Sequence, residues 1–344
     1  MQENKQIKLT SAEISQLWSM YMNDSAAFPI LTYFLNKVED REIKSLLESS
    51  VQICQLHLQK FAEFFKGEGI PVPHGFTIEK DVDLHAPKLF SDTYVLNFLH
   101  HLLKVGLHAQ SINLSVATRK DVSTFFADCI IRDIELYERI KDALLSKGLY
   151  IRAPHIPAPK QVDFVKDQGF LTGFFGEKRP LTVTEITPLY TNLIRNALGV
   201  ATMIGFSQVS QDREVTQFLL RGRDIAKKHC DIFGSALKES YLPVPMTWDS
   251  EVTETTQRVF SDKLMMHVTT ALIGVSIQYY GLAITMSPRR DLGQMYNRLI
   301  AEIQLFAEDG ANLMIKHGWL EEAPKAPDRN ELANEKRETE IYAL

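Results

Sequence analysis

Cysteine is scarce in this chain, and its scarcity argues against two classes of protein. The 344 residues include three cysteines, Cys54, Cys129 and Cys230. They are too few and too widely spaced for a disulfide framework or a cysteine zinc site. We therefore expect a chain that works in a reducing compartment, the cytoplasm.

The chain also lacks an excess of positive charge and long apolar runs. The formal net charge is -5 at pH 7, so the chain has no basic field that would hold nucleic acid or an anionic membrane surface. The N-terminal stretch MQENKQIKLT has no apolar centre, and we expect no signal peptide. No apolar run approaches the length that crosses a bilayer, so we expect no membrane span.

Motifs that would carry catalysis are missing as well. The sequence contains no Gly-x-Ser-x-Gly and no phosphate-binding loop, which argues against those forms of nucleophilic and phosphoryl chemistry. It also contains no Glu-x-x-His, the pair with which ferritin-like bundles hold two metal ions. These absences favour a chain without a catalytic centre.

What the chain does have is an internal repeat. LTSAEISQLW at residues 9–18 matches LTVTEITPLY at 181–190, and the same offset of 172 residues relates His57 to His229. After a slip of two residues, Phe90-Ser91-Asp92 matches FSD at 260–262 with an offset of 170. So many matches in register indicate a duplicated domain, and the unit is far too long for a solenoid repeat.

Each copy is predicted to contain four helices. In the first copy they run over residues 10–37, 40–66, 91–116 and 120–147, with apolar residues spaced alternately by three and four. Thr10 with Glu13, and Thr182 with Glu185, have the spacing of capping boxes at helix starts. No stretch alternates at period two for long enough to predict a sheet.

The connections between these helices favour a particular topology. The first and third are short, which makes antiparallel neighbours, whereas the second spans some twenty residues, about 65 Å when extended. A helix of this length measures about 40 Å, so the long connection can cross the whole bundle. This short, long, short pattern is typical of ferritin-like bundles. An up-down-up-down bundle with an elaborate loop is the alternative.

The domain organisation follows from the repeat. We expect a first bundle over residues 1–150, a linker over 151–180, a second bundle over 181–320 and a charged tail over 321–344. The linker carries Phe164, Phe170, Phe174 and Phe175, which suggests a strap packed across both bundles. Each bundle should have its own core, closed by its own long loop.

Several stretches of the sequence are similar to those of a known group. They are KLTSAEISQLWSMYMND, GFFGEKRPL, LPVPMTWDSEVT, FSDKLMMH, SPRRDLG and AEDGANLMIKHGWLE. On these stretches the chain resembles a family of uncharacterised tandem-repeat proteins of spore-forming bacteria, related in fold to ferritin-like spore-coat proteins. The resemblance implies two tandem ferritin-like four-helix bundles and a link to the spore, and it implies no reaction.

Polar residues interrupt the apolar seams of the first copy, one on each helix. They are Asp24, His57, His100 and Asp133, and two carboxylates with two imidazoles are a plausible ligand set for iron, zinc or manganese. If the ferritin connection holds, the four are spread over about 12 Å of bundle length. The alternative is a buried polar layer that satisfies itself and fixes helix register.

The second copy keeps only half of this pattern. The equivalent positions hold Asn196, His229, Thr270 and Ile303, so a buried polar pair of Asn196 and His229 survives without the other two groups. Glu302, Glu308 and His267 are possible substitutes as ligands. His101 and His317 are expected at the surface or in loops.

Three functions remain open from the sequence. The first is a non-catalytic structural or interaction module, cytoplasmic or associated with the spore, with a second copy or spore-coat proteins as partners. The second is a ferritin-like metal protein with an ion in the core of the first bundle. The third is a pocket between helices for a small apolar ligand, which the sequence neither supports nor excludes.

Overall fold

The structure is a computed structural model that describes residues 7–174 and 178–333. The first copy contains α1 (Ser11–Lys37), α2 (Arg41–Glu68), α3 (Ile78–Asp81), α4 (Asp92–Val116) and α5 (Lys120–Ser146). After η1 (Gln168–Leu171), the second contains α6 (Val183–Val209), α7 (Arg213–Lys238), η2 (Asp249–Glu251), α8 (Asp262–Met286) and α9 (Arg290–Lys316). The predicted all-α fold, with four long helices in each copy, is confirmed.

A buried glutamate fixes where the first bundle begins. The hydroxyl of Thr10 accepts the N–H of Glu13 over 3.2 Å, and the Glu13 carboxylate accepts the N–H of Thr10 over 2.8 Å, which is the predicted capping box. The same carboxylate accepts the N–H groups of Thr118 and Arg119 in the α4–α5 turn, over 2.9 and 2.8 Å. Burial alone would raise the pKa of Glu13, but these donors lower it to about 2.

The helix ends show how each bundle is connected. Asp92 at the start of α4 accepts the N–H groups of Glu39 and Asp40 in the α1–α2 turn, over 3.0 and 2.8 Å. Asp262 at the start of α8 accepts the N–H of Asp212 in the same way, over 3.1 Å. The two short turns of a bundle therefore lie at opposite ends, and the long connection crosses its full length. This is the ferritin-like connection, and it excludes the up-down-up-down alternative.

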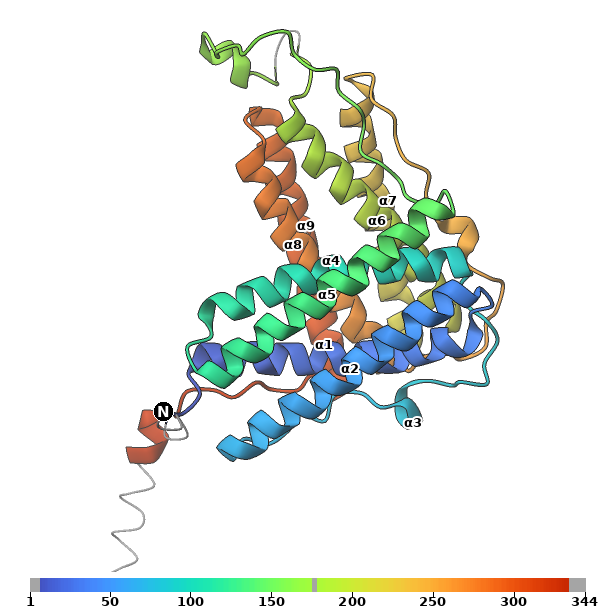
Figure 1. Cartoon of the computed structure of the whole chain (residues 1–344), viewed down its shortest axis with the longest axis vertical. Helices are drawn as coiled ribbons and strands as arrows, with labels where there is room; N and C mark the ends of the chain where they lie inside the picture. The colour runs from blue at the N-terminus through green and yellow to red at the C-terminus, as the bar shows by residue number, and fades with distance from the viewer. Residues whose placement is uncertain (1–6, 175–177, 334–344) are drawn as a thin grey trace, which may run out of the picture.

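The two long connections pair with each other across the copies. Antiparallel bridges join Val82 to Phe260 and Phe90 to Val252. Positions 82 and 252 are equivalent in the two copies, as are 90 and 260, so the two bridges are one contact made twice. Such reciprocity is typical of the two-fold interface of a homodimer, here built within one chain. In Figure 1 the two bundles cross each other at this junction.

The hydrophobic core continues through the junction. Phe90 packs over α6 at Gly205, where an added Cβ would come within 2.4 Å of its ring. Phe260 packs against Tyr33 of α1, with ring centroids 5.2 Å apart. The expectation of two independent cores is therefore wrong, because each long loop inserts its phenylalanine against the first helix of the other copy. One cluster of buried apolar residues includes members of both bundles.

The linker packs less than the sequence predicts. Phe164 is 83% exposed and Phe174 is 51% exposed. Phe170 is partly buried under the guanidinium of Arg179, which lies 3.9 Å from the ring centroid. The prediction of an aromatic strap packed across both bundles is wrong for Phe164 and Phe174, and Phe175 lies outside the described residues.

One helix departs from the expectation about apolar runs. Among the described residues, α8 is long and apolar enough to cross a membrane when judged by length and composition alone. In the structure it is a member of the second bundle and buries Leu264, Met265 and Met266 in the shared core. Only 22% of its apolar window is buried, so α8 is less enclosed than a typical core helix, which passes the same test because it is apolar on most faces.

Candidate functional site

The first bundle buries a histidine beside carboxylates. The Nδ1–H of His57 on α2 donates to Oδ2 of Asp24 on α1 over 2.9 Å, and His57 is 3% exposed. Burial alone would lower the pKa of His57, but the hydrogen bond to Asp24 and the charges of Asp24 and Asp133 raise it. The other ring nitrogen, Nε2, is buried without a hydrogen-bond partner among the described residues.

Asp133 on α5 is the second carboxylate of this group. Burial raises its pKa to about 7, although the charge of His57 acts in the opposite direction. Gly106 of α4 lies beside it, where an added Cβ would be in ordinary contact, 3.5 Å from Oδ2 of Asp133. The neighbouring thiols of Cys54 and Cys129 are buried, and burial raises the pKa of both. They are neutral packing groups in this setting.

His100 lies away from these three residues. Its ring stacks on Tyr137 and packs against Tyr150, each with a centroid distance of 5.4 Å, and burial lowers its pKa to about 3. His100 is about 12 Å along α4 from the end where that helix begins, whereas Asp24 and Asp133 are about 20 Å from the same end. The structure thus places Asp24, His57 and Asp133 near one level, and the four-ligand set stays a prediction.

The donor types in the first bundle suit a transition metal, but their spacing is wide. Imidazole and carboxylate are ligands for iron, manganese and zinc, and Nε2 of His57 is free to coordinate. Over the part of the chain that the structure describes, however, a single trio of such side chains has all its ligand atoms within 4.8 Å of one another, and it lies elsewhere. A metal would have to draw Asp133 and His57 together.

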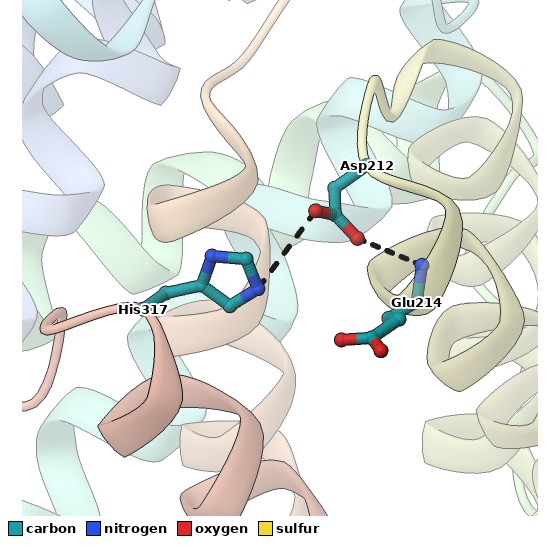
Figure 2. Close-up of side chains that lie close together, drawn as sticks. All are labelled: Asp212, Glu214 and His317. Carbon is teal, nitrogen blue, oxygen red and sulfur yellow. Dashed lines mark hydrogen bonds and ion pairs between the residues drawn. The ribbon is translucent and has the colours of Figure 1, made fainter.

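That trio is Asp212, Glu214 and His317, shown in Figure 2. Asp212 caps α7 by accepting the N–H groups of Glu214 and Val215 over 2.7 and 3.1 Å. Nε2 of His317 lies 3.8 Å from Oδ2 of Asp212, and the ring stacks on Trp319. The Asp212 carboxylate thus has backbone donors, and the exposed Glu214 carboxylate pairs with Lys316 over 2.6 Å.

The first copy explains what this trio does. The position equivalent to His317 holds Lys147, whose ammonium pairs with Asp40 over 2.8 Å and with Glu42 over 2.9 Å. Asp40 caps α2 as Asp212 caps α7. The arrangement is therefore a helix cap with a cation from the last helix beside it, and His317 takes the place of a lysine.

The second bundle completes its polar layer differently. His229 is 1% exposed; Nδ1 accepts from the hydroxyl of Tyr280 over 2.8 Å, and Nε2–H donates to Glu302 over 3.1 Å. Asn196 donates to the same hydroxyl over 2.9 Å. The pair of Asn196 and His229 is thus linked through Tyr280, a residue that the sequence reasoning missed. Thr270 hydrogen-bonds to the backbone of its own helix.

A cavity of about 80 Å³ opens beside this layer, inside the second bundle. All four long helices of that bundle line it, and α4 of the first bundle adds Phe98 and His101 to the lining. One end is polar, with Arg195, Asn196 and Tyr280, and the rest is largely apolar. His101 was expected at the surface and instead lines the cavity, because the crossing of the bundles covers α4.

Arg195 is the second functional residue that sequence reasoning missed. It is 8% exposed, and its guanidinium stacks on Tyr279 at 3.9 Å from the ring centroid. A signal was present in the sequence. Arg195 is the single charged residue of α6 after Glu185, and a lone charge in an otherwise uncharged helix is unusual unless it has a specific role.

Comparison with known proteins identifies the family. Two consecutive segments, residues 1–162 and 169–332, each match the family described as "Protein of unknown function (DUF3231)". The chain belongs to this family. Each matched segment contains one four-helix group, so the duplication read from the sequence is a duplication of the family unit. The search of curated proteins gave no match.

A solved structure is also similar to part of the chain. It is the crystal structure of a protein from Bacillus halodurans C-125, BH2358, titled "putative spore coat protein". The match has 18% sequence identity and a TM-score of 0.38, and it covers 46% of this chain and 100% of the other. At this level the likeness carries no argument about function.

Proposed function

We propose that this DUF3231 chain is an interaction module that holds a small, largely apolar ligand in the core of its second bundle. The observation that carries the proposal is the cavity of about 80 Å³, walled by all four helices of that bundle and by α4 of the first. Tightly packed interiors contain few voids larger than a water molecule. A space several times that size, with one polar end, has the features of a ligand site.

The residues around the cavity support binding without a reaction. His229 and Tyr280 are held in a hydrogen-bond network with Asn196 and Glu302. Burial raises the pKa of Tyr280 beyond the physiological range and lowers that of His229. A neutral imidazole with both nitrogens engaged is a fixed polar wall rather than a general base ready to accept a proton.

Cavity blocking tests the proposal. Gly199 of α6 lines the cavity, and a Cβ there meets nothing within 4 Å. The variant Gly199→Leu should fill the space and abolish binding of small probes such as hexanol or hexanoate. Gly274→Leu is the matched control. Gly274 is an exposed glycine of α8, and a Cβ added there also meets nothing within 4 Å.

Binding can be measured by calorimetric titration and by amide shift changes. For ligands of this size we expect dissociation constants on the order of 1 mM. At least one probe should bind the unmodified chain and Gly274→Leu at one site and fail to bind Gly199→Leu. If neither probe binds the unmodified chain, or if Gly199→Leu binds as well as the control, the proposed function is wrong.

A metal in the first bundle is the second candidate function. The buried, unpartnered Nε2 of His57 near Asp133 favours it. Iron, manganese or zinc bound there would supply Lewis-acid or redox chemistry, and His57, Asp24 and Asp133 would hold it. Metal analysis after purification without chelator tests this. A stoichiometric metal that is lost in His57→Ala supports it, and clean protein after iron and zinc loading refutes it.

The location and partners of the chain are proposed on the sequence resemblance alone. We expect it in the cytoplasm or at the spore, with a second copy or spore-coat proteins as partners. A fluorescent fusion followed through sporulation tests this, and a signal confined to the growth medium would contradict it.

A further inference from the structure

The cavity of the second bundle contains a cation without a counter-ion. Arg195 lines it and is 8% exposed. Its Nε and Nη1 are buried and have no hydrogen-bond partner among the described residues. It stacks on the Tyr279 ring, which satisfies the face of the guanidinium and leaves Nε and Nη1 in its plane without an acceptor.

The surroundings of Arg195 add positive charge rather than negative. Within the described residues no carboxylate forms an ion pair with it. The titratable groups that face it are His101 and Lys104 of α4 and Tyr279 and Tyr280 of α8. Burial, together with the charges of Arg195 and Lys104, places the pKa of His101 well below its ordinary value.

Such an arrangement is costly for the folded chain alone. A buried charge loses its hydration, and the loss is offset only by a partner of opposite charge or by several hydrogen bonds. Most buried groups escape by changing protonation state, but arginine stays protonated in proteins. Arg195 therefore remains a cation that faces a mostly apolar cavity.

We infer that the ligand of this cavity is a small carboxylic acid whose carboxylate binds Arg195 and whose short apolar tail fills the rest. The inference rests on the proposed function. The juxtaposition that carries it is the unpaired guanidinium at one end of the cavity and apolar side chains, including Met203, Ile273 and Phe306, along the other. A carboxylate accepts hydrogen bonds from arginine N–H groups in the guanidinium plane.

Size and lining select this class of anion. Arg195 and Met203 are eight residues apart on α6, so the cavity extends over about 12 Å of helix. Its volume is about half that of an engineered cavity of about 150 Å³ that takes up benzene. A tail on the order of three to five carbon atoms fits such a space. A fully hydrated inorganic anion would leave the apolar walls without contacts.

The test compares two probes of equal length, hexanoate and hexanol. We expect hexanoate to bind the unmodified chain at least tenfold more tightly than hexanol, and Arg195→Met to weaken hexanoate at least tenfold while hexanol changes less than threefold. Arg213→Met is the matched control, because it removes an exposed arginine at the start of α7. It should leave both affinities unchanged. Circular dichroism and cooperative unfolding show that each variant is folded.

The outcomes separate this inference from the proposed function. If hexanol binds the cavity as tightly as hexanoate, or if Arg195→Met leaves hexanoate binding unchanged, the carboxylate inference is wrong and the ligand site stands. If neither probe binds, both are wrong. If inorganic phosphate or chloride competes as well as hexanoate and the tail adds no affinity, the site takes simple anions and the inference is overturned. Arg195→Lys should restore part of the preference for hexanoate, because it returns the charge without the planar donors.

Discussion

The two bundles share an ancestor and a connection pattern, but they treat one buried histidine in opposite ways. In the first, Nδ1–H of His57 donates to Asp24, and two carboxylates raise its pKa. In the second, Nδ1 of His229 accepts from Tyr280, and burial lowers its pKa. The equivalent helix position thus holds a histidine that favours its proton in one copy and one that favours the neutral form in the other.

This difference shows that, after a duplication, equivalent core positions can acquire different residues and different protonation preferences. The exchange of Asp24 for Asn196 and of Asp133 for Ile303 removes two carboxylates, and a different one, Glu302, bonds to His229 in the second layer. A cavity with Arg195 at its polar end lies beside this layer. In the first bundle the buried charged groups lie within the polar layer. In the second bundle the buried charge of Arg195 faces the cavity. Substitutions at equivalent positions can test each half of this contrast.

The largest expected effect concerns the paired loops. Phe90→Ala and Phe260→Ala should each lower the free energy of unfolding by about 3–5 kcal/mol, because each removes a fully buried ring from the shared core. Urea unfolding measures both. Phe164→Ala serves as the control, since an 83% exposed ring should change stability by less than about 0.5 kcal/mol. If a variant lowered the stability of one bundle while the other bundle unfolded at the same urea concentration as before, the shared core would be contradicted.

The next effect depends on pH and belongs to the first bundle alone. The pKa of Asp133 is about 7 in the folded chain, above the ordinary value of an unfolded aspartate, about 4. Its contribution to stability is therefore full below pH 4 and is lost as the pH rises toward 7. Asp133→Asn should come closest to the unmodified chain near pH 4 and be more stable by a few kcal/mol at pH 8.

Urea unfolding at the two pH values checks this prediction. Ile303 occupies the equivalent position of the second copy, so Ile303→Val is a control whose cost should be the same at both pH values. A difference between Asp133→Asn and the unmodified chain that does not vary with pH would show that Asp133 stays ionised in the folded state.

A smaller gain is expected at the charged end of the cavity. In the absence of ligand, Arg195→Met should stabilise the chain by about 1–4 kcal/mol, because it replaces an unpaired buried cation with an apolar side chain of similar length. Thermal unfolding measures the gain. The equivalent residue of the first copy, Asn23, is exposed, and Asn23→Met should change stability by less than about 0.5 kcal/mol. Destabilisation by Arg195→Met would mean that the guanidinium already has strong partners.

The smallest effect concerns the trio at the end of the second bundle. His317→Lys converts its cap to the form found in the first copy, where Lys147 pairs with Asp40 and Glu42. We expect a change in stability below about 1 kcal/mol, since these ion pairs face solvent. Zinc added to the unmodified chain should not raise its melting temperature. A zinc-dependent rise that is lost in His317→Lys would show that the trio binds metal.

Much of the fold could be predicted because its signals are local. Capping residues such as Thr10, apolar spacing and connection lengths gave the helices and favoured the ferritin-like connection. The polar layer was also predicted in outline, since Asp24 and His57 follow the apolar seams of their helices. His100 follows an apolar seam as well. Its distance from the group of Asp24, His57 and Asp133 depends on which end of the bundle each short turn occupies, and the sequence left that open.

The site in the second bundle could not be predicted in the same way. Tyr280 replaces Gln110 of the first copy, and nothing in that exchange shows that its hydroxyl would join His229 to Asn196. The cavity is a property of five helices from two copies. Arg195 stood out in the sequence as a lone charge, but its burial depends on the crossing of the bundles, which brings His101 over it.

The sequence by itself determined the duplication, the eight long helices and which residues interrupt their apolar seams, because these depend on contacts a few residues apart. The tertiary structure alone decided that the halves share one core, that three of the four predicted ligands lie near one level, and that a buried arginine faces a cavity. Those features depend on how the long loops pair across the copies, and packing between elements far apart in the chain leaves no fixed spacing in the sequence.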